Sequence, residues 1–171
     1  MPRVALDLTK EADRRKVNGV WRRAMGWIPG EPNQGLTAET AASPARLPDY
    51  DDSGWEITDN LREGISKGLS FGWWRITVEL PEEVDGQPVA GTQVFFETNI
   101  DDYGEVWVDG QIDLVRGSVA GFNQQQRVTV IASAEPGAKH VIACLAANGP
   151  LGAPGGGIFM RYATLAFESR G

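Results

Sequence analysis

Short runs in which apolar and polar residues alternate recur along most of this chain. The clearest alternating runs lie at residues 72–80, 94–100, 127–131 and 158–168. Such alternation is typical of β-strands that bury one face and expose the other. Residues 140–147 are mostly apolar instead, as expected of a strand that is buried on both faces. The pattern therefore predicts a protein built from strands, with little helix.

Turn signals separate these runs. Asp109-Gly110 stands between two apolar runs, and both residues tolerate the positive φ that the centre of a two-residue hairpin requires. Pro81 ends one predicted strand, and Glu135-Pro136-Gly137 follows another. Short strands joined by turns predict an all-β fold, a jelly-roll β-sandwich.

The first part of the chain is less regular. Residues 9–15 are charged and predict one or two helical turns, with Thr9 as the N-cap. Residues 17–28 fit a helical face and a bulged strand equally well. Residues 29–48 are rich in Pro, Gly, Ala, Ser and Thr and predict a long loop. We therefore divide the chain into an N-terminal extension and loop, residues 1–47, packed on a sandwich formed by residues 48–171.

Composition narrows the functional classes. The 171 residues suit one domain, and the net charge of −7 argues against nucleic-acid or anionic-membrane partners, since both require clustered positive charge. No apolar run is long enough to span a membrane, and the first residues lack the apolar centre of a signal peptide, so we expect a cytoplasmic protein. The single cysteine, Cys144, lies in an apolar run and is expected to be a buried, unreactive thiol.

Three motifs occur in order along the chain. They are Tyr50-Asp51-Asp52-Ser53-Gly54-Trp55, then Phe71-Gly72-Trp73-Trp74-Arg75 with Leu80-Pro81, and then DDYGEVWVDG at residues 101–110. Together they resemble galactose-binding-like jelly-roll domains, including the sugar-binding domain of family 2 glycoside hydrolases. With Gly121-Phe122-Asn123 and Ala147-Asn148-Gly149-Pro150, the chain resembles more closely a small domain found beside gluconolactonase-type proteins. The resemblance implies a jelly roll that binds a sugar, binds a partner or braces an enzyme.

The densest group of carboxylates follows the predicted strand at residues 94–100. Asp101, Asp102 and Glu105 flank Tyr103. In an extended chain Asp101 and Asp102 would point to opposite faces, so at most one would share a pocket with Tyr103 or Glu105. Two interpretations stay open: a ligand or acid-base site, or a solvated bend in which an aspartate caps backbone N–H groups.

Other polar and aromatic residues are candidates for the same ligand site. Trp73 and Trp74 are neighbours on one strand, so one is expected to pack inward and the other to form a stacking platform for a sugar ring beside Arg75. Arg161 is expected to line the same concave face as Arg75. Asn123 and Asn148 lie in glycine-rich loops of the kind that hold ligands in the domains this chain resembles.

Three functional hypotheses follow, of which we favour the first. It is a non-catalytic domain that binds a sugar or sugar-derived small molecule through tryptophan, carboxylates, arginine and asparagine. The second is a small hydrolase or lyase in which Asp102 or Glu105 is the base and His140 or Tyr103 assists. The third is an interaction subunit, either a homodimer or the accessory partner of an enzyme.

A cofactor is not expected, because one His and one Cys cannot build a metal site rich in those ligands. A structural calcium ion is the one candidate, with Asp49, Asp51 and Asp52 as its ligands at a loop. The favoured alternative is that these aspartates form a capped turn.

Overall fold

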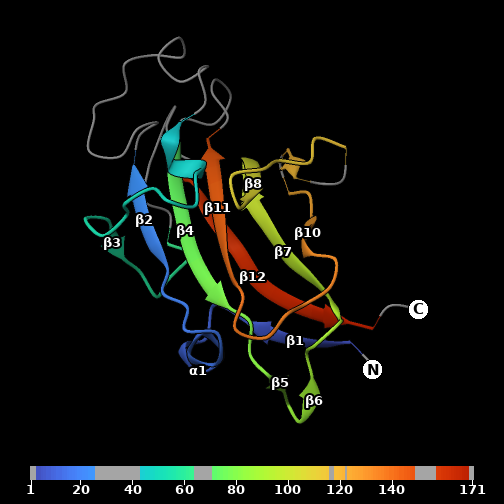
Figure 1. Cartoon of the computed structure of the whole chain (residues 1–171). Helices are drawn as coiled ribbons and strands as arrows, with labels where there is room; N and C mark the ends of the chain where they lie inside the picture. The colour runs from blue at the N-terminus through green and yellow to red at the C-terminus, as the bar shows by residue number, and fades with distance from the viewer. Residues whose placement is uncertain are drawn as a thin grey trace.

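The computed structural model describes residues 3–25, 43–63, 71–115, 118–121, 123–148 and 157–169, and it is a sandwich of two antiparallel sheets (Figure 1). The four-stranded sheet has the order β1 (Val4–Asp7), β12 (Phe159–Glu168), β7 (Gln93–Asp101) and β10 (Gln126–Ile131). The six-stranded sheet has the order β3 (Glu56–Ile57), β2 (Arg22–Met25), β4 (Phe71–Glu79), β11 (Lys139–Ala147), β8 (Tyr103–Val108) and β9 (Val119–Ala120). The smaller elements are the hairpin of β5 (Glu83–Val84) and β6 (Gln87–Pro88), the helix α1 (Glu11–Lys16) and the 3-10 turn η1 (Pro44–Arg46). The predicted jelly-roll β-sandwich is confirmed.

Alternation along the strands builds the core between the two sheets. On β4, Trp74, Ile76 and Val78 point inward and are almost completely buried, and Phe96 on β7 faces them from the other sheet. Cys144 on β11 lies in the same core, and burial raises the pKa of its thiol, in agreement with the expected unreactive side chain. Among the described residues, no helix is long and apolar enough to cross a membrane.

The turn at Asp109-Gly110 forms as the sequence predicts. Both residues have positive φ, 49° and 77°. Val108 and Gln111 exchange two backbone hydrogen bonds of 2.9 Å across the turn. Local chemistry is sufficient here, because Asp and Gly are among the few residues that adopt this conformation easily.

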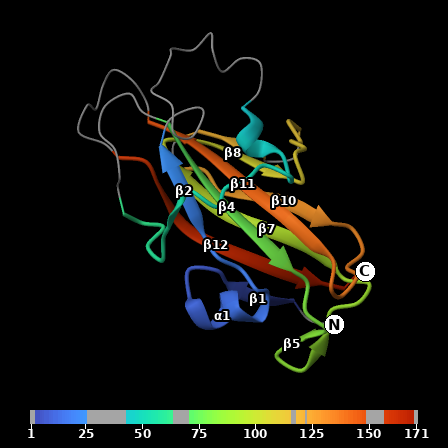
Figure 2. The same cartoon turned by 60° about the vertical axis from the view of Figure 1, so that its left-hand side comes forward.

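The N-terminal residues are part of the sandwich, which corrects the division at residue 47. β1 pairs with β12, with Val4 opposite Phe167, and β2 pairs with β4 (Figure 2). Residues 4–25 thus give one strand to each sheet. The predicted N-cap is also wrong: Lys10 occupies that position, and the Thr9 hydroxyl donates to Asp7 at 2.6 Å instead.

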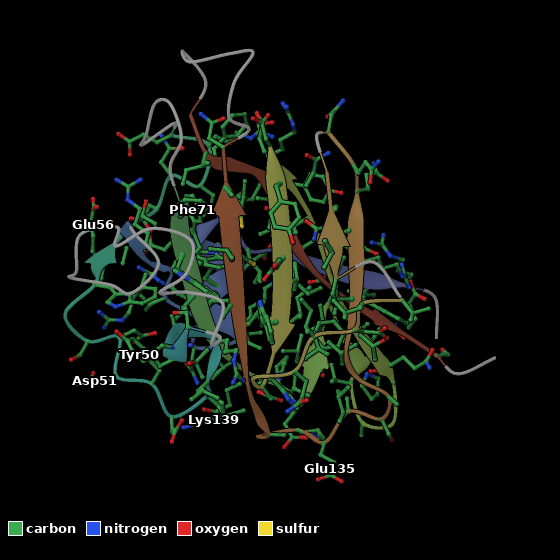
Figure 3. All side chains as sticks on the ribbon, turned by 90° about the horizontal axis from the view of Figure 1, so that it is seen from above. Tyr50, Asp51, Glu56, Phe71, Glu135 and Lys139 are labelled. Carbon is green, nitrogen blue, oxygen red and sulfur yellow. The ribbon has the colours of Figure 1, made fainter. Side chains whose placement is uncertain are left out.

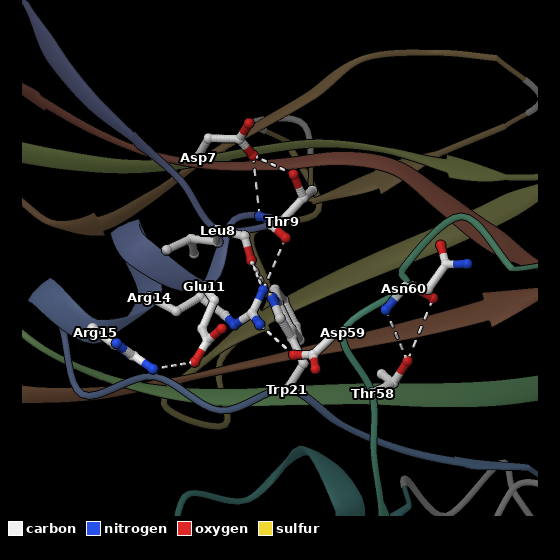
Figure 4. A network of polar contacts seen from close by, with 10 residues as sticks. All are labelled: Asp7, Leu8, Thr9, Glu11, Arg14, Arg15, Trp21, Thr58, Asp59 and Asn60. Atoms are coloured by element: carbon white, nitrogen blue, oxygen red, sulfur yellow. Dashed lines mark hydrogen bonds and ion pairs between the residues drawn. The ribbon is translucent and has the colours of Figure 1, made fainter.

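A network of polar contacts holds this N-terminal segment in place (Figure 4). The buried guanidinium of Arg14 donates to the carbonyl oxygens of Leu8 (3.1 Å) and Thr9 (2.9 Å) and forms an ion pair with Asp59. The indole N–H of Trp21 also donates to the Leu8 carbonyl, at 3.0 Å. These bonds connect β1 and α1 to the segment that follows β3.

A second apolar cluster lies on the outer face of the six-stranded sheet. We call residues 43–55 the covering segment, because Ala45 and Trp55 from it pack on Trp73, Ala143 and Leu145 of the sheet. A sheet whose two faces are both covered loses the polar outer face that alternation alone predicts. This coverage decides which candidate site residues remain accessible.

Candidate functional site

The acidic corner, residues 101–105, lies where β7 ends and β8 begins. Asp102 forms a bend between the two strands, and the Asp101–Asp102 peptide bond is cis. A side chain at Gly104 would place its Cβ 2.5 Å from the Cβ of Ile100. Glycine at this position therefore allows β8 to start in close contact with the end of β7.

The two adjacent aspartates interact, which corrects the expectation that they point to opposite faces. Their side chains form a hydrogen bond. The strict alternation of an extended strand does not apply, because Asp102 lies in the bend. Burial raises the pKa of the Asp101 carboxyl, the hydrogen bond and charge of Asp102 raise it further, and Arg161 acts in the opposite direction.

Three buried polar atoms at this corner lack a hydrogen-bond partner within the described residues. They are Oδ1 of Asn99, Oδ1 of Asp101 and Nε of Arg161. Two other contacts of these side chains are long: Arg161 Nη2 is 3.4 Å from Asp101 Oδ2, and Asn99 Nδ2 is 3.5 Å from Asn123 Oδ1. Buried polar atoms are paired in most proteins, so a group of unpaired ones points to a missing partner.

Strand geometry brings these side chains together. Asn99 and Asp101 are two residues apart on β7 and share the outer face of the four-stranded sheet. β12 is irregular between Met160 and Ala163, and this places Arg161 beside them. The sequence predicted Asp101, Arg161 and Asn123 as ligand-binding residues but missed Asn99. Its signal was present: an amide two residues before Asp101, on the same predicted face.

Tyr103 and Glu105 belong to a different face. On β8 they point to the outer side of the six-stranded sheet, in line with Trp107. The Glu105 carboxylate accepts hydrogen bonds from the Tyr103 hydroxyl (2.7 Å) and from the Trp107 indole N–H (2.9 Å). Burial and the nearby Glu105 carboxylate raise the pKa of Tyr103. Both oxygens of Glu105 therefore have protein partners.

The stacking platform predicted at Trp73 and Trp74 is absent. Trp74 lies in the core, and Trp73 is only 2% exposed because the covering segment packs on it. Arg75 is also 2% exposed. Its guanidinium donates to Asp52 at 2.9 Å, to the Leu47 carbonyl at 3.0 Å and to the carbonyls of Ala45 and Tyr50.

Arg75 and Arg161 do not share a concave face, because β4 and β12 belong to different sheets. Asn148 is buried directly after β11, near the end of the six-stranded sheet where Ala147 pairs with Tyr103. Asn123 is exposed and has a φ of 55°. The predicted ligand-binding residues are therefore divided between the two sheets.

The predicted catalytic residues are not assembled. His140 lies at the start of β11, and its Nδ1 is 2.7 Å from Asp109 Oδ2. Tyr103, by contrast, pairs with Ala147 near the end of that strand. Seven residues of strand separate His140 from Ala147, roughly 23 Å. His140 therefore cannot act together with Asp102 and Glu105.

The three aspartates predicted as calcium ligands have protein partners or point to solvent. Asp52 pairs with Arg75 at 2.9 Å and Arg22 at 3.5 Å, and Asp51 Oδ1 accepts the Ser53 backbone N–H at 2.9 Å. Asp49 is exposed. In the part of the chain that the structure describes, no three His, Cys, Asp or Glu side chains form a group that could hold a metal ion.

Comparisons with known proteins identify the fold. No family model and no curated protein matches the chain. A β-glucuronidase of Bacteroides uniformis is similar in structure, with a TM-score of 0.59 and 17% identity over 96% of this chain and 18% of its own. A β-glucuronidase from glycoside hydrolase family 2 has a TM-score of 0.61 at 16% identity, over 98% of this chain and 18% of its own.

The Faecalibacterium prausnitzii β-glucuronidase has a TM-score of 0.57 at 17% identity, over 98% of this chain and 32% of its own. This chain thus spans about a fifth to a third of the length of these enzymes. The resemblance to the domain beside gluconolactonase-type proteins stays a prediction. At these identities the similarity is one of fold, and the chain shares the jelly-roll sandwich found in one part of these β-glucuronidases.

Proposed function

We propose that this domain binds a sugar or a sugar-derived small molecule at the acidic corner. The unpaired atoms of Asn99, Asp101 and Arg161 carry the proposal. They offer two acceptors and one donor, and sugar hydroxyls both donate and accept hydrogen bonds. A buried polar atom without a partner costs about 1–3 kcal/mol, so a ligand that pairs with these atoms recovers part of that cost.

The fold supports the choice of ligand class. The similar structures are β-glucuronidases, enzymes named for a sugar acid, and this chain corresponds to one part of them. Glucuronides and neutral glycosides are therefore the first ligands to test. A catalytic role at the same corner has no support in the geometry, since His140 is remote and both oxygens of Glu105 are occupied.

The test is an NMR titration of the protein with methyl β-glucuronide and methyl β-glucoside. We expect saturable shifts of the backbone amides at residues 99–103 and 157–162 with at least one of them. In Asp101→Asn, one charged acceptor is replaced by a neutral one, and the affinity is expected to fall by about tenfold or more.

Asp85→Asn is the matched control, because Asp85 is exposed on a turn with a φ of 50°, which asparagine tolerates. It should bind as the unchanged protein does. Absence of shifts with both glycosides, or equal affinity of the Asp101→Asn variant and the unchanged protein, would contradict the proposal.

A further inference from the structure

A separate groove of about 620 Å³ opens beside β2 and β3, at the edge of the six-stranded sheet that β3 forms. Tyr50, Asp51 and Glu56 from its lining lie on the same side of the molecule (Figure 3). None of the residues of the acidic corner lines it. The lining residues that matter for its chemistry are Arg23, Tyr50, Asp51, Gly54, Trp55 and Glu56.

Two aromatic rings form a rigid apolar part of the groove. The ring centroids of Tyr50 and Trp55 are 5.7 Å apart, with the planes tilted by 60°. The buried guanidinium of Arg75 fixes both, at 5.5 Å from the Tyr50 ring and 6.0 Å from the Trp55 ring. Tyr50 is half-buried, so one part of its ring is held by the protein and another part remains accessible.

Oriented polar groups surround these rings. Arg23 holds the Glu56 carboxylate with two hydrogen bonds of 2.9 Å and lies 3.0 Å from Glu63. Asp51 is oriented by Ser53, and the hydrogen bonds from the Ser53 side chain and backbone N–H lower the pKa of Asp51. The groove thus presents acceptors and donors in fixed positions before any ligand arrives, which reduces the entropic cost of binding.

The charges in the groove favour a neutral ligand. The carboxylates of Glu56 and Glu63 are paired with Arg23, and Asp52 nearby is paired with Arg75. Neither sign dominates, so a strongly anionic or cationic ligand would meet like charge as well as opposite charge. An aromatic surface with a ring of mixed donors and acceptors is suited instead to a molecule with an apolar face and several hydroxyl groups.

We propose that this groove is a second ligand site, and that it binds a neutral saccharide ring stacked on the accessible part of Tyr50, with the buried Trp55 as the wall beside it. The hydroxyl groups of the ring donate to Asp51 and Glu56, and Arg23 holds the Glu56 carboxylate in position. The site rests on its own residues and not on the acidic corner. The acidic-corner site is built on β7 and β12 of the four-stranded sheet, whereas the groove is lined by residues of β2 and β3 of the six-stranded sheet, so the two sites lie on different sheets. They are therefore testable one at a time.

The test follows the indole N–H resonance of Trp55 by NMR, assigned with Trp55→Phe. The probes are methyl β-glucoside, methyl β-galactoside and methyl α-mannoside, each up to about 50 mM, which detects millimolar dissociation constants. We expect a saturable shift of the Trp55 signal with at least one glycoside. The same shift should persist in Asp101→Asn, which separates this groove from the acidic corner.

Gly54→Gln blocks the groove without disturbing its walls. A Cβ built at Gly54 meets no atom within 4 Å, and the φ of Gly54 is outside the left-handed region, so the new side chain enters open space. We expect the affinity for the glycoside, measured from the Trp55 signal, to fall at least tenfold. Ala90→Gln adds the same side chain at an exposed position of a remote turn and should leave the affinity unchanged.

Three results would overturn the second site. The first is a Trp55 signal that shifts with none of the glycosides. The second is a shift in Gly54→Gln with the same affinity as in the unchanged protein. The third is a shift with methylguanidinium or acetate but with none of the glycosides, which would mean that the groove selects an ion.

Discussion

Arg75 and Arg161, which the sequence assigned to one face, have opposite environments. The guanidinium of Arg75 is surrounded by Asp52 and backbone carbonyls, so its donors are used within the protein. Arg161 keeps an unpaired Nε beside Asp101, whose Oδ1 is also unpaired. The residue type alone predicted neither outcome. What differs is the number of acceptors that the fold brings to each side chain.

The raised pKa of Asp101 predicts a specific dependence of stability on pH. In the folded state the pKa lies above its ordinary value of 3.8 because of burial and Asp102. The stability that Asp101 contributes is therefore fully present below its unfolded pKa and is lost as the pH rises through the folded pKa. Asparagine does not titrate. The stability of Asp101→Asn relative to the unchanged protein should therefore increase as the pH is raised from about 3.5 to about 7.

Urea unfolding of both proteins at the two pH values measures this difference. Ionisable groups that do not contact Asp101 are common to both proteins and cancel in the comparison. A stability difference that is constant with pH, or that favours the aspartate at neutral pH, would show that the Asp101 carboxyl is not disfavoured as an anion in the folded protein. If Asp101→Asn is more stable at neutral pH but binds the glycoside more weakly, the stability lost by keeping Asp101 is linked to ligand binding.

Among the elements, the covering segment depends on a strand that it does not pair with. Arg75 of β4 donates to the carbonyls of Ala45, Leu47 and Tyr50, so one side chain holds three points of residues 43–55. The same side chain holds the rings of Tyr50 and Trp55, which line the proposed groove. One side chain therefore holds both the covering segment and two of the residues that line the groove.

Arg75→Met should lower the free energy of unfolding by about 3–5 kcal/mol, because it leaves the Asp52 carboxylate and the three carbonyls without their donor. Arg22→Met is the control: Arg22 also contacts Asp52, at 3.5 Å, but is half-buried, and we expect a loss below about 1 kcal/mol. Urea unfolding measures both. Equal losses in the two variants would show that Arg75 is no more than an ordinary surface ion pair.

At the scale of the whole molecule, the N-terminal segment joins the two sheets. β1 lies at the edge of the four-stranded sheet and β2 inside the six-stranded sheet, with α1 between them in the chain. Leu6, Leu8, Val17 and Trp21 from this segment are fully buried in the common core. The domain is therefore continuous from its N-terminal strand to β12.

A chain shortened to residues 48–171 should not fold cooperatively. It lacks β1, β2 and the fully buried side chains of Leu6, Leu8, Val17 and Trp21, and loss of a single large core side chain already costs about 3–5 kcal/mol. Circular dichroism during heating compares the folding of the shortened and the full chain. The chemical-shift dispersion of the amide NMR signals is a second measure. A sharp melting transition with dispersed amide signals would restore the original division at residue 47.

Most strands and the turn at Asp109-Gly110 were predictable because their causes are local. Period-two alternation marked β4, β7, β10 and β12, a mostly apolar run marked β11, and Asp109-Gly110 marked the hairpin turn with its two positive φ angles. The short β2 was ambiguous, since four residues of mixed character fit a helix and a strand alike. At the corner, residue type predicted Asp101 and Arg161, whereas Asn99, two residues before Asp101 on the same face, was recognised from its unpaired oxygen.

The sequence by itself determined the strands, their turns and the two faces of each strand, because these depend on neighbouring residues. The tertiary structure alone decided which faces are covered, because coverage depends on segments distant in the chain. It buried Trp73 and Arg75 beneath residues 43–55, and it separated His140 from Asp102 by the length of β11. It also opened the groove beside Tyr50 and Trp55, whose walls come from two strands and a turn that alternation cannot bring together.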